Sequence, residues 1–139
     1  MGRRHLAREV AMQVVFEMEH HEAAAAEDAV RYHFEDQPGS EDQVRFALAL
    51  VQGTLDNREA IDKEITASST NWRLDQMAGV ERAVLRVALY ELMFTPEVPV
   101  KAAINESIEL AKTFGGDEAG RFVNGVLGKV ASHLSGTPQ

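Results

Sequence analysis

Apolar residues recur every three or four positions along most of this chain, the spacing of helices that are buried on one side. In the first helix, expected over about residues 4–20, this stripe consists of Leu6, Val10, Val14 and Met18. No segment shows the sustained polar–apolar alternation that is typical of a β-strand. The pattern therefore predicts an all-α protein.

Two further helices are expected in the N-terminal half. An Ala-rich segment at about 22–34 predicts the second helix. A third is expected to follow Ser40, whose spacing from Gln43 is that of a capping box. Apolar residues at helical spacing extend this third helix to Ile65, and Gly53 inside it indicates a close crossing with another helix.

The C-terminal half is expected to hold one short helical segment, at 72–77, and three longer helices. The segment 80–94 is the most hydrophobic in the chain, so it is expected to be the central, most buried helix. The next helix, at about 102–111, should stop at the Gly pair 115–116, and Asp117 is expected to cap the last one. The elements add up to a seven-helix bundle.

A polar run at 68–71 is expected to divide the bundle into two helical sub-bundles. The N-terminal one would cover about 1–69 and the C-terminal one about 70–135. The length of 139 residues suits a single domain, 1–139, in which the two halves share one core.

Composition narrows the class of protein. The chain has no cysteine, which excludes disulfides, a thiolate nucleophile and Cys-ligated zinc. No apolar run approaches the ~20 residues of a membrane span, and the charged N-terminus lacks the apolar centre of a signal peptide. We therefore expect a cytoplasmic protein with no membrane contact.

Charge is unevenly distributed. The net charge is −8, which argues against non-specific coating of nucleic acid. The first eight residues nevertheless carry Arg3, Arg4 and Arg8 and no acid, whereas residues 17–42 hold nine acids and, among Lys and Arg, the single base Arg31. Charge alone leaves two interpretations open: a phosphate-binding end, or a few solvated arginines beside an acidic helix.

No residue set points to catalysis. A metal site would need Glu17, His20 and His21 to converge with His33, and no HExxH-type pattern is present. The glycines at 115–116 lack the Lys-Ser/Thr of a phosphate loop, and no nucleophile elbow occurs. We therefore expect no enzyme activity, no metal and no cofactor.

Three blocks in the C-terminal half resemble the signature of the bacterial NusB family. They are VERAVLRVALYEL at 80–92, VPVKAAINESIELAKTFG at 98–115 and RFVNGVL at 121–127. The stretch from Arg4 to Phe16 also resembles the Arg-rich opening helix of that family. A related helical module precedes a methyltransferase domain in some RNA-modifying enzymes, but this chain stops where that domain would begin, so the resemblance is to the free-standing protein.

The resemblance implies a two-sub-bundle helical fold and a role in processive transcription antitermination, especially of ribosomal RNA operons. Proteins of this family pair with the ribosomal protein NusE and bind the single-stranded boxA element of nascent RNA. The complex then joins other Nus factors on RNA polymerase.

Site residues are carried over only onto matching positions. The family's Arg-rich motif matches Arg3, Arg4, His5 and Arg8. Its basic residue near the RNA face matches Arg121, and an acidic position near its RNA-binding region matches Glu118. Phe122, next to Arg121, is the remaining candidate for RNA binding. Phe122 could stack on an unpaired base, although burial in the core explains it equally well. The resemblance places Phe16 and Glu81 at the NusE contact. The basic run is diluted, with His5 and Leu6 where close relatives hold more arginine, and Phe16 replaces a tyrosine.

Two rival functions remain at this point. One is a self-associating regulatory protein that buries its Arg face in a homodimer. The other is a fragment of an RNA-modifying enzyme, for which a cofactor site would be the distinguishing feature, and the sequence shows none.

Overall fold

The computed structural model describes residues 3–20, 25–36 and 39–136, with the side chains of Arg3, His20 and Asp36 left out. All regular structure in this part of the chain is helical. It comprises α1 (Arg3–Glu17), η1 (Met18–His20), α2 (Ala26–Asp36), α3 (Glu41–Asp56), α4 (Arg58–Ser68), η3 (Leu74–Gln76), α5 (Gly79–Phe94), α6 (Val100–Gly115) and α7 (Asp117–Ser135). The expected all-α fold with seven α-helices is confirmed.

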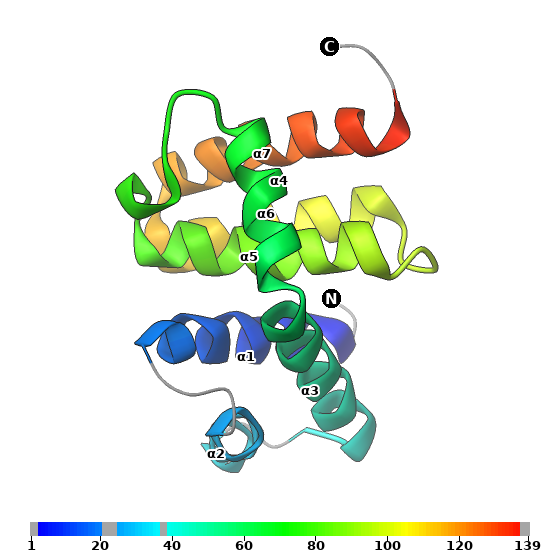
Figure 1. Ribbon diagram of the computed structural model, residues 1–139. Helices are drawn as coiled ribbons and strands as arrows, with labels where there is room; N and C mark the ends of the chain where they lie inside the picture. The colour runs from blue at the N-terminus through cyan, green and yellow to red at the C-terminus, as the bar shows by residue number, and fades with distance from the viewer. Residues whose placement is uncertain (1–2, 21–24, 37–38, 137–139) are drawn as a thin grey trace.

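The helices form two groups that share one core (Figure 1). Helices α1, α2 and α3 pack on one another, and α4, α6 and α7 gather around α5. Helix α5 also packs against α1 and α3, so it joins the two groups. Among the described residues, no helix is both long and apolar enough to cross a membrane.

Helix α5 is the central helix that its hydrophobicity predicted. Every residue from Ala83 to Leu89 is buried, which is burial on all sides of the helix. This continuous burial includes one charged side chain, Arg86, and Glu91 is buried one turn further on. Charged groups inside a core must be paired, and both are.

The expected third helix is in fact two helices. Helix α3 ends at Asp56, and α4 begins at Arg58, because Asn57 leaves the helical conformation with ψ of 20°. Its side-chain amide donates a hydrogen bond to the carbonyl of Gly53 and so competes with a continuing helix. Helix α4 then packs on α5 and α7. We therefore propose that the two sub-bundles meet at Asn57 instead of residue 69.

Three other boundaries differ from the expectation. The first helix gives way to the 3-10 turn η1 after Glu17, and the segment 72–77 forms only the 3-10 turn η3. Asp117 does not cap α7. Gly116 occupies that position with φ of 90°, a left-handed conformation that glycine adopts without strain, and Asp117 is the first helical residue. The predicted capping box of Ser40 and Gln43 is confirmed.

The close crossing predicted at Gly53 is confirmed as well, because a Cβ there would overlap the ring of Tyr90 on α5. We expect Gly53→Ala to destabilise the protein by about 1–3 kcal/mol, despite the better helix propensity of alanine. Urea unfolding measures the change. Gly128→Ala on α7 is the matched control, because nothing lies within 4 Å of a Cβ at that position. A stabilised Gly53→Ala variant would show that Tyr90 moves aside freely.

Candidate functional site

The start of α1 forms a basic end of the molecule. The guanidinium of Arg4 is exposed and lies over the ring of Phe46 on α3, 4.5 Å from its centroid. Arg4, Phe46 and Arg45 line a surface hollow of about 490 Å³. Arg4 makes no ion pair with any side chain that the structure describes, so its charge is available to a partner.

The other predicted residues of this end are already engaged. Arg8 is only 6 % exposed and donates two hydrogen bonds, of 2.8 and 2.9 Å, to the buried carboxylate of Glu91. Glu106 on α6 lies 3.4 Å from Arg8 and 2.9 Å from Nδ1 of His5. Arg8 therefore fixes α1 against α5 and α6 instead of facing solvent. The side chain of Arg3 lies outside the described residues.

A second group of predicted residues meets beside the start of α5. Glu81, Glu118, Arg121 and Phe122 line one hollow of about 370 Å³, together with Trp72. Phe122 is half-buried and contacts Trp72 edge-on, with 6.3 Å between ring centroids and an interplanar angle of 86°. Phe122 therefore packs against the core and also lines the surface hollow. Glu81 accepts a hydrogen bond from the backbone N–H of Ala78 at 3.1 Å, which caps α5.

Phe16 lies close to this second group. It is 46 % exposed and covers Gly79, where a Cβ would clash with its ring. Phe16, Val80 and the exposed Phe114 line an apolar hollow of about 270 Å³ that Glu17 borders. Phe16 and Glu81, the two residues predicted to contact a protein partner, therefore lie on neighbouring hollows at one end of α5.

The predicted RNA-binding residues do not form one patch. Arg8 near the start of α1 meets Glu91 near the end of α5, whereas Phe16 meets Gly79 at the start of α5. The two helices are thus antiparallel, and Figure 1 shows α1 and α7 beginning at opposite ends of the molecule. Phe16 lies twelve positions after Arg4 in α1, which is a rise of about 18 Å along the helix. The predicted residues thus lie in two separate groups. We call them the basic end (Arg4, His5, Arg8) and the aromatic end (Trp72, Glu118, Arg121, Phe122).

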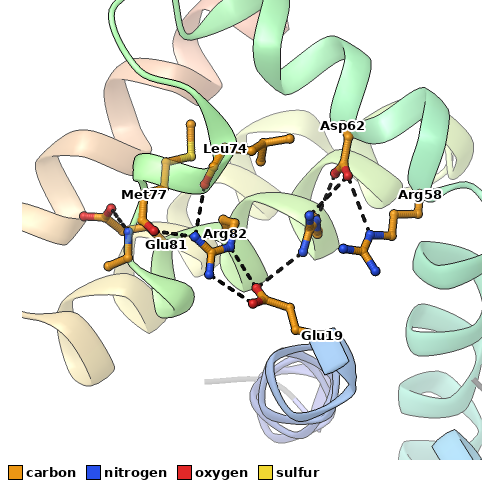
Figure 2. Close-up of polar contacts among 9 residues, drawn as sticks. Glu19, Arg58, Asp62, Leu74, Met77, Glu81 and Arg82 are labelled. Atoms are coloured by element: carbon orange, nitrogen blue, oxygen red, sulfur yellow. Dashed lines mark hydrogen bonds and ion pairs between the residues drawn. The ribbon is translucent and has the colours of Figure 1, made fainter. Parts of the chain in front are cut away.

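Sequence reasoning missed a chain of ion pairs under the aromatic end (Figure 2). Arg82 donates hydrogen bonds of 2.8 and 3.0 Å to Glu19, and Arg86 joins Glu19 to Asp62 on α4. The hydrogen bonds to Glu19 raise the pKa of Arg82 above its ordinary value. The spacing of Arg82 and Arg86 on the most apolar helix was the available signal, because charges inside a core need partners.

Arg82 also holds the segment that carries the aromatic end. Its guanidinium donates hydrogen bonds to the carbonyl of Leu74, the first residue of η3, and to that of Met77, which directly follows η3 (Figure 2). Met77 and Gln76 line the same hollow as Trp72. The ion-pair network therefore ties the wall of this hollow to α1 and α5.

The histidines near the end of α1 and two asparagines next to core positions are the other polar residues with a possible binding role. His33 pairs with Glu17 at 2.9 Å, and His21 lies outside the described residues. No group of three metal-ligating side chains occurs in the described ranges. Asn105 and Asn124, which sit beside core positions in the sequence, are both exposed.

The fold and these open hollows define an all-helical protein with one basic and one aromatic surface. The sequence model of the NusB family matches residues 5–132. The chain therefore belongs to the NusB family. It is 47 % identical over 134 residues to the transcription antitermination protein NusB of Anaeromyxobacter dehalogenans strain 2CP-1, covering 96 % of this chain and 93 % of that one. The NusB protein of Geobacter sulfurreducens is 40 % identical, with coverages of 96 % and 97 %.

Solved structures agree with the assignment. NusB of T. maritima superposes with a TM-score of 0.84 at 30 % identity, covering 95 % of this chain and 92 % of that chain. A chain from a crystal structure of the antitermination factors NusB and NusE in complex with double-stranded RNA superposes with a TM-score of 0.83 at 26 % identity, with coverages of 94 % and 97 %.

Proposed function

We propose that this chain is a transcription antitermination factor, an adaptor without enzyme activity. It binds boxA RNA together with the ribosomal protein NusE and supports processive transcription of ribosomal RNA operons in the cytoplasm. The bound complex joins RNA polymerase and other Nus factors. Relatives at 40–47 % identity are named as antitermination proteins, and a structural neighbour was solved with NusE and RNA.

The main observation in favour of RNA binding is that two exposed arginines lack an ion-pair partner. Most arginines in the described ranges pair with carboxylates. Arg4 and Arg121 make no such pair there, and each lies beside an aromatic ring on an open hollow. On a chain of net charge −8, two exposed cations beside aromatic rings suit the phosphates and bases of single-stranded RNA.

Phe16 and Glu81 support the protein part of the proposal. An apolar hollow with an exposed Phe16 suits a partner's apolar side chain. Glu17 on this hollow and Glu81 on the neighbouring one suit a basic protein such as NusE. Because the chain offers few phosphate contacts of its own, NusE is expected to strengthen RNA binding by enlarging the surface.

A binding experiment tests this cooperation. Labelled boxA RNA is titrated with the chain, with NusE and with an equimolar mixture, and fluorescence anisotropy gives each Kd. We expect the mixture to bind more tightly than either protein alone. Equal affinity with and without NusE would contradict the cooperative part of the proposal, and no binding by the mixture would contradict the RNA function itself.

The role of Arg4 is tested by a salt series. We expect Arg4→Ala to weaken boxA binding and to reduce the slope of log K against log salt by about one unit, because one phosphate contact is lost. Arg31→Ala on α2 is the control, since Arg31 is exposed and pairs with Glu27 at 3.2 Å. An unchanged slope for Arg4→Ala would move the RNA contact away from the basic end.

A further inference from the structure

A second hollow lies on the other side of Trp72. It has a volume of about 210 Å³ and is formed by the last residue of α4, the loop at 69–72 and α7. Arg121, Gly125 and Lys129 follow one another at four-residue spacing along one face of α7, so they line this hollow in a row. The two cations are about 12 Å apart along the helix axis, with the glycine between them.

Ser69 gives an independent sign that a polar group fits here. It is only 7 % exposed, and its hydroxyl has no hydrogen-bond partner in the described part of the chain. Ser69 lines the hollow. Leaving a buried hydroxyl unpaired costs about 1–3 kcal/mol, so such a group calls for an explanation, and a ligand that bonds to it supplies one.

The two cations on α7 are also without partners. Neither Arg121 nor Lys129 forms an ion pair with a described side chain, although acids outnumber bases in this protein. Trp72 stands between this hollow and its neighbour and is 52 % exposed. An exposed indole on the same hollow as two unpaired cations suits a base that stacks and phosphates that pair.

Gly125 keeps the hollow open. A Cβ at this position would meet nothing within 4 Å, so packing inside the protein does not require a glycine here. Glycine in a helix costs up to ~1 kcal/mol relative to alanine. Gly128 on the same helix is equally unpacked but does not line the hollow, so a side chain would enter the hollow only at position 125.

We propose that this hollow is a subsite for one nucleotide of single-stranded RNA. The base stacks on Trp72, Arg121 and Lys129 hold the flanking phosphates, and the hydroxyl of Ser69 bonds to the base or the ribose. The inference rests on the proposed RNA-binding function and extends it to Trp72, Ser69 and Lys129.

The test fills the hollow without removing any contact. The Gly125→Leu variant places a side chain in it, and Gly128→Leu is the matched control, since Gly128 is an exposed glycine on the same helix that also has nothing within 4 Å of a Cβ. Binding of labelled boxA RNA is measured with NusE present. We expect Gly125→Leu to weaken binding about tenfold, the loss of one stacked base, and Gly128→Leu to leave it unchanged.

The outcomes separate this subsite from the general function. If wild type binds RNA and Gly125→Leu binds it equally well, the subsite is refuted and the RNA function stands. If wild type with NusE binds no RNA, the proposed function fails first. Circular dichroism and thermal unfolding of both leucine variants confirm that each is folded.

Fluorescence distinguishes RNA from a free nucleotide. Trp72 is the only tryptophan, so its emission in the isolated chain reports on stacking directly. We expect a boxA oligonucleotide to quench it, with the same midpoint as binding measured by anisotropy. RNA that binds without quenching would overturn the proposal. Quenching by uridine or adenosine 5′-monophosphate but not by RNA would assign the hollow to a free nucleotide and would also overturn it.

Discussion

Replacing Glu91 by alanine is expected to lower the free energy of unfolding by about 3–5 kcal/mol. Glu91 is 2 % exposed and accepts both hydrogen bonds of Arg8, so its removal leaves a buried guanidinium with only the longer contact to Glu106. The cost is mainly that of a buried charge without its partner. Urea unfolding followed by circular dichroism measures it.

A double variant separates the cost of an unpaired buried charge from the net contribution of the Arg8–Glu91 pair to stability. Arg8→Met combined with Glu91→Leu removes both charges and keeps apolar volume. We expect its free energy of unfolding to be within about 1 kcal/mol of the wild-type value, or higher, because the cost of desolvating two buried charges offsets their attraction. If the double variant is as unstable as Glu91→Ala, the pair itself stabilises the fold, and the desolvation argument is wrong.

The second large effect is expected at Arg82. Arg82→Met removes the bidentate pair with Glu19 and the hydrogen bonds to the carbonyls of Leu74 and Met77. We expect a loss of about 2–3 kcal/mol, since these hydrogen bonds involve charged groups and are partly buried. Released from Arg82, η3 should also shift, and the emission of Trp72 in the folded variant should change with it.

Arg73→Met provides the comparison. Arg73 lies next to η3 and pairs with Asp75, but this pair is fully exposed, so its removal should change neither stability nor emission measurably. A shift of Trp72 emission in Arg73→Met equal to that in Arg82→Met would show that any charge lost near η3 disturbs the segment. A stable Arg82→Met variant with wild-type emission would refute the anchoring role.

The fold could be predicted largely because its helices follow the apolar period. The central helix α5, whose residues 83–89 are all buried, could be predicted for that reason. The capping box at Ser40 could be predicted from the spacing of Ser40 and Gln43. The break at Asn57 was not, because apolar spacing continues across it to Ile61 and only a local side-chain hydrogen bond ends α3. A period identifies which residues are buried, but it does not require the helix to be unbroken.

The sequence indicated individual residues of the candidate site, but it did not indicate how they are arranged in space. Helical spacing placed Arg4 and Arg8 on one face, yet one is exposed and the other is buried against Glu91, 83 positions away in sequence. Local spacing contains no information about such a distant partner. The sequence indicated Arg121 and Phe122 as a cation next to an aromatic residue, but only the structure placed them beside Trp72, at the far end from Arg4.

Two arginine–carboxylate contacts join α1 to α5 near both ends of α1. The buried pair of Arg8 and Glu91 lies at one end, and the partly buried pair of Glu19 and Arg82 lies just beyond the other. Because these two contacts lie near opposite ends of α1, they oppose both sliding and rotation of α1 against α5. The basic and aromatic ends are therefore held at a constant separation. An RNA strand that touches both must be long enough to bridge that gap, so affinity should rise stepwise with strand length and not gradually.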